Sequence, residues 1–359
     1  MNIRELNCKT IEENNMENRM KISVLLVFVA LMLDPLGNSV AMENMAKVAK
    51  WYRNYDGAVS LRFDDNRDSH IEVVVPTLDR YGFRATFMVN PGQNNYIKNR
   101  DFWEREVVSR GHRLGNHTMN HRGAKTLEEA EYEIGEAAKI LRSVQKDESD
   151  LMVFAAGGLT IWGDAEWEKS SYSYKRLTEK FLLIDLYDGF HRAKHVHSTH
   201  TSKDLCVLVQ KAIEMEAHQA FVFHDIGSPG VKDLVKLVKN GYHLTFGKES
   251  FMDFLDCLEG KKEKMWIAPL VNIYKYEAER NSASLTMIEN GRKLVRLNLK
   301  VETNPNLYDQ KLTVVLPASG RKVSRILQEG EPVQEYESVN NVVLVHVKPR
   351  TSEIAIFHE

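Results

Sequence analysis

The sequence predicts an α/β fold built on a parallel sheet, followed by a smaller all-β domain. Two observations carry this prediction. Between residues 58 and 246, short runs rich in apolar side chains alternate with amphipathic stretches, which is typical of strands connected by helices in a parallel sheet. After residue 280, apolar and polar residues alternate one by one, which is typical of strands with one buried face.

The composition fits a globular protein and argues against nucleic acid as a partner. The 359 residues are enough for about two domains. Lysine and arginine number 48 against 50 aspartates and glutamates, a net charge of −2, so no basic excess exists to neutralise a phosphate backbone. Three cysteines are too few and too scattered for a zinc ribbon or a disulfide framework. A metal site would therefore take its ligands mainly from histidine, aspartate and glutamate.

Residues 1–41 are predicted to be a secretory signal peptide. A nearly unbroken apolar run over residues 22–33 follows Arg19 and Lys21, and it is too short to span a bilayer. Small residues then precede a plausible cleavage point after Ala41. We therefore expect a secreted or periplasmic protein with no transmembrane segment in its mature chain.

The first domain is expected over residues 51–260, with the highly charged residues 261–264 closing it. Its strands are predicted over residues 58–63, 84–89, 151–154, 181–186, 220–223 and 243–246. Helices are predicted over residues 127–141, 205–215 and 231–239, the first opening on a capping box of Thr126 and Glu129.

The second domain is expected over residues 265–359 and is predicted to be a β-sandwich-like fold. Residues 295–301 alternate apolar and polar side chains, and Asn290 and Gly291 before them form a hairpin signal. Further strands are predicted over residues 312–316, 342–347 and 353–357.

Polar groups suited to metal chemistry follow the predicted strands. The strand over residues 58–63 ends at the adjacent carboxylates of Asp64 and Asp65, and His117 and His121 lie four residues apart further along. One carboxylate with two imidazoles suits zinc or another divalent transition metal with open coordination positions. The other carboxylate would then be free to act as a general base.

With these groups in place, the sequence resembles the polysaccharide deacetylase family, the NodB-like carbohydrate esterases. The resemblance extends over residues 55–258 and rests on four segments in the family's order, residues 63–65, 85–89, 115–121 and 222–225. It implies an irregular (β/α) barrel of the deacetylase type, with the site at the carboxyl ends of its strands.

The resemblance also implies a role for each site residue. Asp64 takes the place of the catalytic base, and His224 that of the general acid. Asp65, His117 and His121 take the places of the metal ligands, with zinc as the expected ion and cobalt or nickel as alternatives. Asp225 either orients His224 or caps the turn that follows it.

The sequence departs from the family in two places. The third motif of the family usually begins with an arginine that holds the base and continues with a proline, but residues 153–158 contain neither. We expect Arg62 or Arg192 to replace that arginine. In the region of the fourth motif, Asp185 and Asp188 both lie near the end of a predicted strand. The sequence does not show which of them, if either, supports His224.

Three further features are interpreted as structural. The histidine-rich residues 191–200 contain no carboxylate, which favours a loop at the rim of the site over a second metal site. Cys206 and Cys257 occupy apolar positions of predicted helices, which favours two buried thiols over a disulfide. Packing in the core or between domains is the expected role of the tryptophans Trp51, Trp103, Trp162, Trp167 and Trp266.

The function expected from this resemblance is the metal-dependent hydrolysis of acetyl groups from a polysaccharide or oligosaccharide, with N-acetyl groups favoured over O-acetyl groups. Two alternatives stay open. The missing arginine is compatible with a carbohydrate-binding protein of the cell envelope that has lost turnover. The same fold would also serve a hydrolase of another non-peptide amide. The sequence leaves the oligomeric state open.

Overall fold

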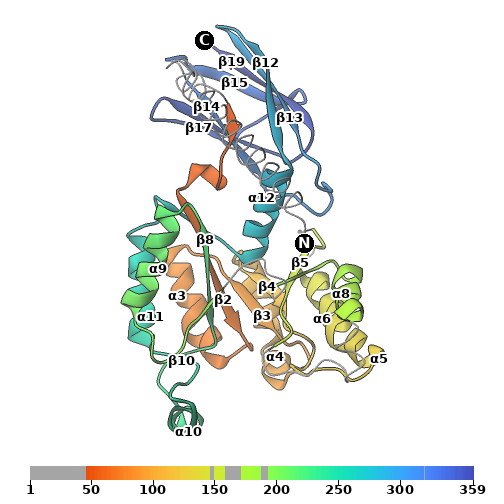
Figure 1. Ribbon diagram of the computed structural model, residues 1–359, viewed down its shortest axis with the longest axis vertical. Coiled ribbons are helices and arrows are strands. Elements are labelled where there is room, and N and C mark those ends of the chain that lie inside the picture. The colour runs from red at the N-terminus through yellow and green to blue at the C-terminus, as the bar shows by residue number, and fades with distance from the viewer. Residues whose placement is uncertain (1–45, 146–148, 158–170, 187–192, 319) are drawn as a thin grey trace, which may run out of the picture. The chain divides into compact units, whose positions relative to one another are not determined.

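The computed structural model of the chain describes residues 46–145, 149–157, 171–186, 193–318 and 320–359 (Figure 1). The expected signal peptide, residues 1–41, lies outside these described residues. No helix in the described part of the chain has the length and hydropathy needed to cross a membrane. Residues 47–359 form one unit by their internal contacts.

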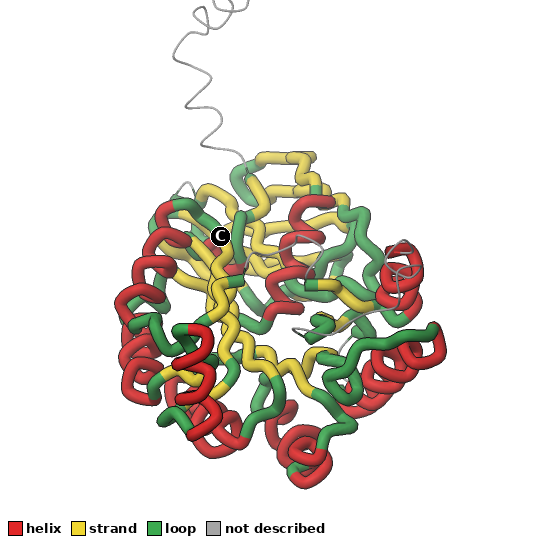
Figure 2. The backbone as a smooth tube through the Cα atoms, turned by 60° about the horizontal axis from the view of Figure 1, so that its bottom comes forward, coloured by secondary structure: helices red, strands yellow, loops and turns green. Residues whose placement is uncertain are grey.

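A parallel sheet of eight strands forms the first part of the fold, and it confirms the predicted α/β class. The strands are hydrogen-bonded in the order β6-β5-β4-β3-β2-β8-β7, and β11 also pairs with β2. They are β2 (Gly57–Asp64), β3 (Thr86–Val89), β4 (Arg113–Asn116), β5 (Met152–Phe154), β6 (Leu183–Asp185), β7 (Lys194–His195), β8 (His218–Phe223) and β11 (Met265–Ile267). Figure 2 shows these strands curving round with helices outside them, as an irregular barrel requires.

Helices connect the strands, and most of them cover the outer face of the sheet, whereas α10 projects away from it (Figure 1). They are α3 (Val75–Tyr81), α4 (Asn94–Lys98), α5 (Leu127–Ala130), α6 (Ala137–Val144), α8 (Ser171–Lys180), α9 (Ser202–Glu214), α10 (Val231–Asn240) and α11 (Lys248–Glu259). A π-helical segment, Glu131–Glu136, joins α5 to α6, so the helix predicted from residue 127 continues to Val144. Thr126 caps this helix by accepting a hydrogen bond from the backbone N–H of Glu129.

The strand predicted over residues 243–246 does not join the main sheet. Only its last two residues, β10 (Thr245–Phe246), are extended, and they pair in parallel with β9 (Asp225–Ile226). The structure also contains β4, β7 and β11, which the sequence did not predict as strands. β4 (RLGN) has one large apolar side chain and β7 (KH) has none. β11 is a three-residue run directly after the charged residues 261–264, so none of the three forms a long apolar run in the sequence.

The two faces of β2 have different roles. Val59, Leu61 and Phe63 belong to the core between sheet and helices, and the ring of Phe63 stacks on Phe87 and Phe223 with centroids 5.3 Å apart in both pairs. Successive side chains of a strand alternate between faces. Arg62 and Asp64 therefore point to the interior of the barrel, where both are buried.

The helix α12 (Leu270–Ser282) fills the amino-terminal end of the barrel. The backbone N–H of Leu270 donates to Thr86 Oγ1 (2.9 Å), and Ser60 Oγ donates to the carbonyl of Ala268 (2.9 Å). Leu270 also packs with Met88 and neighbouring residues of β5 and β8 in an apolar cluster. These contacts close the barrel interior on the side away from the carboxyl ends of the strands.

Two antiparallel sheets form the C-terminal part of the fold, as predicted, and one of them also includes a short strand from before the barrel, β1. One has the order β1-β14-β18-β17 and the other β12-β13-β19-β15-β16. Their strands are β1 (Lys47–Val48), β12 (Ser284–Asn290), β13 (Leu294–Lys300), β14 (Leu312–Pro317), β15 (Val323–Gln328), β16 (Glu331–Pro332), β17 (Tyr336–Val339), β18 (Val342–Val347) and β19 (Ser352–His358). The predicted hairpin joins β12 to β13, and the N–H of Gly291 donates to the carbonyl of Leu294.

Cys206 and Cys257 form a disulfide, so the expectation of two buried thiols is wrong. The bridge joins α9 to α11, and the two Cα atoms lie 6.3 Å apart, within the usual range for a disulfide. The two helices pack side by side on the sheet. This adjacency, which no local pattern encodes, brings the thiols together.

Candidate metal and catalytic site

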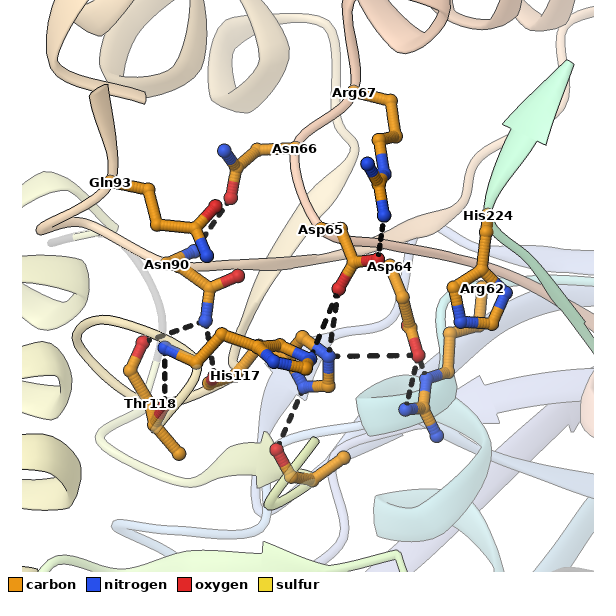
Figure 3. A network of polar contacts seen from close by, with 12 residues as sticks. Arg62, Asp64, Asp65, Asn66, Arg67, Asn90, Gln93, His117, Thr118 and His224 are labelled. Carbon is orange, nitrogen blue, oxygen red and sulfur yellow. Dashed lines mark hydrogen bonds and ion pairs between the residues drawn. The ribbon is translucent and has the colours of Figure 1, made fainter. Parts of the chain in front are cut away.

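The structure brings all five predicted site residues together at the carboxyl ends of the parallel strands. Figure 3 labels four of them, Asp64, Asp65, His117 and His224. Asp64 is the last residue of β2 and Asp65 follows it, His117 follows β4, and His224 follows β8. The rings of His117 and His121 lie 4.8 Å apart between centroids. Ligand sites of open α/β sheets form at this edge because neighbouring strands end there together.

Arg62 holds the carboxylate of Asp64 in a buried bidentate ion pair. Arg62 Nε donates to Oδ1 and Nη2 donates to Oδ2, each at 2.6 Å, and both side chains are almost fully buried. Burial alone would raise the pKa of Asp64, but Arg62 and the nearby imidazoles of His117 and His224 hold that pKa below its usual value. Arg62 thus supplies the cation that residues 153–158 lack. The other expected candidate, Arg192, lies outside the described residues.

Asp65 Oδ1 faces the Nε2 atoms of both histidines. It lies 3.4 Å from His117 Nε2 and 3.3 Å from His121 Nε2, yet within the described residues this buried oxygen accepts no hydrogen bond. The other oxygen, Oδ2, accepts a hydrogen bond from Arg67 at 2.6 Å. Burial opposes ionisation of Asp65, but the two imidazoles and Arg67 hold its pKa well below the usual range.

The residues present fit a divalent metal ion. One ligand atom from each of Asp65, His117 and His121 lies within 4.8 Å of the others. Ligands of a tetrahedral zinc ion at about 2.1 Å are about 3.4 Å apart, which matches the two distances from Asp65 Oδ1. His117 Nδ1 donates to the carbonyl of Ala155 (2.8 Å), which leaves Nε2 free for a metal, as is usual for metal-binding histidines.

Left-handed backbone conformations aim these side chains into the site. Asp65, Asn66, Thr118 and His121 all have positive φ angles, between 41° and 76°. Such conformations cost free energy in residues other than glycine and tend to gather at functional sites. Local hydrogen bonds hold two of them in place, because His121 N–H donates to Thr118 Oγ1 (3.0 Å) and Thr118 N–H to Asn116 Oδ1 (2.9 Å).

Asn66 and Asn90 form a buried bridge between the loops that carry Asp65 and His117. The N–H of Asn90 donates to Asn66 Oδ1 (2.9 Å), and Asn90 Nδ2 donates to the carbonyls of His117 and Thr118. Asn90 was not predicted as a site residue, although it lies directly after β3, a position at which parallel sheets place functional groups. Its role depends on contacts with two distant loops.

His224 and His117 lie on opposite sides of Asp64 in Figure 3. Burial lowers the pKa of His224, against the opposing effect of the Asp64 and Asp65 charges. His70 Nε2 donates to the backbone carbonyl of His224, which fixes the loop and not the ring. The Nδ1 atom of His224 is buried without a hydrogen-bond partner in the described chain. Asp225 accepts a hydrogen bond from Ser69 Oγ, and this contact favours a turn-fixing role for Asp225.

The segment that lacks the expected arginine still contributes to the site. Ala155 supplies the carbonyl that binds His117, and Gly157 adopts a φ of 79° against the ring of His121. A Cβ at Gly157 would lie 2.8 Å from His121 Nε2. The close approach of this backbone to His121 therefore requires glycine.

Of the features interpreted as structural, the tryptophans and the histidine-rich segment agree with the described structure where it covers them. Trp51, Trp103 and Trp266 are buried, whereas Trp162 and Trp167 lie outside the described residues. His195 ends β7 beside β8, and its pKa, lowered by burial, responds also to the charges of Arg62 and Asp64. This segment therefore reaches the rim of the site. Asp185 ends β6, and Asp188 is not among the described residues.

Comparison with known proteins identified one matching family model. Residues 53–172 match the family model described as polysaccharide deacetylase. A gellan lyase from a Bacillus species is 20% identical over 334 residues, which are 87% of this chain and 13% of that relative. The chain thus spans only a small part of the length of this curated relative.

Two solved structures illustrate the fold comparison. A peptidoglycan deacetylase from Bacillus subtilis is 12% identical, with 65% of this chain and 96% of that chain covered and a TM-score of 0.37. A family 4 carbohydrate esterase from Streptomyces lividans in complex with acetate is 16% identical, with 59% and 92% covered and a TM-score of 0.35.

Proposed function

We propose that the chain is a member of the polysaccharide deacetylase family, whose model matches residues 53–172, and that it hydrolyses acetyl groups from a polysaccharide or oligosaccharide, with N-acetyl groups preferred over O-acetyl groups. One observation carries the proposal. A cluster of one carboxylate and two imidazoles lies beside a second, arginine-bound carboxylate at the carboxyl ends of the strands. This combination suits metal-assisted hydrolysis with a general base.

We assign Asp65, His117 and His121 as ligands of a divalent metal ion. The unsatisfied Oδ1 of Asp65 and the orientation of His117 by the Ala155 carbonyl support this assignment. Nitrogen and carboxylate ligands favour zinc, with cobalt or nickel as alternatives. When bound, such an ion supplies Lewis-acid chemistry, which polarises an acetyl carbonyl and makes water more acidic.

Asp64 is the proposed base. Its bond to Arg62 keeps the carboxylate ionised and fixes its direction toward the site. As water adds to the acetyl carbon, Asp64 accepts a proton from that water. Arg62 holds the carboxylate during this transfer and does not itself gain or lose a proton.

His224 is the proposed acid. When the bond between the acetyl carbon and the sugar nitrogen breaks, His224 donates a proton to that nitrogen, so that acetate and a free amine result. Burial disfavours the imidazolium in the resting site, and negative charge developing on the substrate favours it. The ring takes up a proton from solvent as that charge develops and passes it to the leaving nitrogen.

The alternative of a carbohydrate-binding protein without turnover was motivated by the missing third-motif arginine. Arg62 removes that motive, because it binds Asp64 through two hydrogen bonds from the same strand. Hydrolysis of another non-peptide amide remains compatible with this set of groups, and the choice of substrate decides between the two reactions.

Acetate release from a panel of N-acetylated and O-acetylated glycans tests the proposal. The protein is stripped with a chelator and then reloaded with zinc, cobalt or nickel. We expect release that requires metal and that is faster on N-acetylated glycans. Stoichiometric metal without acetate from any glycan would overturn the deacetylase proposal, and turnover of simple amides alone would favour the second reaction.

We also propose that the protein is exported and comprises two domains, residues 51–260 and 265–359, after a signal peptide over residues 1–41. The Cys206–Cys257 disulfide supports export, because such bonds persist in oxidising compartments. A mature protein from its native host is expected to begin near Met42, and an intact apolar run in a cytoplasmic protein would contradict this.

A further inference from the structure

The helix α10 (Val231–Asn240) stands apart from the barrel. It is inserted between β9 and β10, and Figure 1 shows it projecting beyond the other helices of the barrel. Every residue of α10 except Asp233 is exposed, and none is buried. The insertion begins shortly after His224, so the helix projects at the edge of the sheet where the site lies.

One face of α10 is apolar and uncovered. Val231, Leu234, Val235 and Val238 follow the spacing that places side chains on one stripe of a helix. They are 80%, 49%, 62% and 89% exposed, respectively. An isolated helix of ten residues is marginal in water, because most helical stability comes from packing of the apolar face. We therefore expect the apolar stripe of α10 to pack against a surface outside this chain.

The charged residues of α10 are all lysines except Asp233. Lys232, Lys236 and Lys239 lie together on one flank of the apolar stripe, at 100° per residue. The single acidic residue, Asp233, is already occupied, since it accepts hydrogen bonds from Gly230 N–H (3.1 Å) and Thr245 Oγ1 (2.8 Å). The helix thus offers an apolar stripe with an adjoining cationic band.

We propose that α10 docks on an anionic lipid bilayer, with its apolar stripe in the interface and its lysines at the lipid phosphates. Short basic amphipathic helices bind in this way. Charge disfavours a second copy of the chain as the partner, because antiparallel pairing about a two-fold axis brings one lysine flank against the other. A glycan is disfavoured as well, because sugar rings pack on aromatic side chains and the stripe is aliphatic.

Co-sedimentation of the full chain with vesicles tests the proposal. Vesicles of phosphatidylcholine with phosphatidylglycerol are compared with vesicles of phosphatidylcholine alone, at low and at high salt. We expect binding to the anionic vesicles that weakens with salt. Val235→Asp is expected to weaken binding at least tenfold, because it places a charge in the apolar stripe. The double variant Lys236→Gln/Lys239→Gln is expected to weaken it by about fivefold per lysine.

Matched controls lie far from α10. Ile288→Asp changes an apolar side chain of β12 that is 52% exposed, and Lys262→Gln/Lys264→Gln neutralises two exposed lysines beyond α11. Both are expected to bind like the wild type.

Val238→Ser removes apolar area without adding a charge and should weaken binding in the same direction as Val235→Asp. Equal melting temperatures of all variants confirm intact folding.

Three results would overturn the proposal. They are an absence of binding to anionic vesicles, equal binding to both lipid compositions, and binding that Val235→Asp leaves unchanged. Sedimentation velocity adds a fourth, since a dimer that Val235→Asp dissolves, without vesicle binding, would identify a second copy as the partner. None of these outcomes depends on the proposed deacetylase activity.

Discussion

Arg62 and Asp64 are two residues apart on β2 and form a bidentate ion pair inside the barrel. Their spacing puts both side chains on the same face of the strand, so the strand itself sets the geometry of the pair. The expected third-motif arginine would have come from another strand. In this chain, the proposed base and its cationic partner therefore move as one rigid element.

Arg62→Ala is expected to destabilise the fold and to reduce turnover. It leaves the Asp64 carboxylate buried without its main partner, a change that typically costs about 3–5 kcal/mol. It also raises the pKa of Asp64, so that less of the base is ionised. Urea unfolding measures the first effect, and the pH dependence of acetate release measures the second.

Arg296→Ala is the matched control, because Arg296 makes the same two-bond contact with Glu353 (2.9 and 2.5 Å) on the exposed face of β13. An exposed pair is worth about 0–1 kcal/mol, and this one is remote from the site. Equal losses of stability in the two variants would contradict the role assigned to burial of the Arg62 pair.

Asp64→Asn and Asp65→Asn are expected to differ although the residues are neighbours. Asp64→Asn removes the proton acceptor, so metal content should stay near that of the wild type while turnover falls by about 10² to 10⁴. Asp65→Asn removes an anionic ligand, so it should weaken metal binding, and excess metal should partly restore activity.

Metal analysis and acetate release on both variants separate the two roles. His224→Ala is the third variant, and it is expected to keep its metal and lose turnover. The loss of turnover should be smallest on substrates whose leaving group needs little protonation. If Asp64→Asn loses its metal and Asp65→Asn keeps it, the two assignments are reversed.

Gly157→Ala is expected to weaken metal binding through His121. Its added Cβ would lie 2.8 Å from His121 Nε2, so the ring must move. Gly82→Ala is the control, because Gly82 has a similar φ of 71° but no atom within 4 Å of the added Cβ. Both variants strain the backbone by about 1–2 kcal/mol, the cost of a left-handed conformation in a residue with a Cβ. Calorimetric titration with zinc should show weaker binding only for Gly157→Ala, and equal affinities would refute the contact.

Glu279 is expected to make the protein less stable as the pH rises. This residue of α12 is buried, and burial raises its pKa from 4.5 to about 9. Between these values the folded protein holds a proton that the unfolded chain has lost. The free energy of unfolding therefore falls with rising pH, by up to about 1.4 kcal/mol per pH unit.

Glu279→Gln keeps the shape of the side chain and removes its titration. Urea unfolding of wild type and variant at several pH values should give stabilities that converge below pH 4.5 and separate progressively between pH 4.5 and about 9, with the variant the more stable. Parallel curves over the whole range would show that Glu279 does not carry this dependence.

The sequence predicted the strands of the parallel sheet where apolar runs are long, as in β2 and β8. It missed β4 and β7 because their residues, RLGN and KH, contain no apolar run. The reactive groups were predictable because they follow strand ends in a recognisable order. The residues that hold these groups in place were not predictable, because Asn90 and His70 form hydrogen bonds with loops distant in the sequence. His70 and His224, for example, are 154 residues apart.

Loss of the Cys206–Cys257 disulfide is expected to lower stability without affecting the site. The bridge closes a loop with a sequence separation of 51 residues, for which a stabilisation of about 2–4 kcal/mol is typical. The double variant Cys206→Ala/Cys257→Ala should therefore melt at a lower temperature than the wild type while it binds zinc with the same affinity. Reduction of the wild type should reproduce the shift, and a reductant-insensitive melting curve would count against the bridge.

The way α12 closes the barrel bears on how this protein changes over evolution. The helix leads from β11, which pairs with β2, into the antiparallel sheets, and its first residue bonds to Thr86 of β3. The same chain segment is therefore both the floor of the barrel and the stem of the C-terminal sheets. A recombination event that exchanged those sheets at this stem would expose the apolar interior of the barrel to water. Compensating substitutions are therefore expected across the boundary between the two parts.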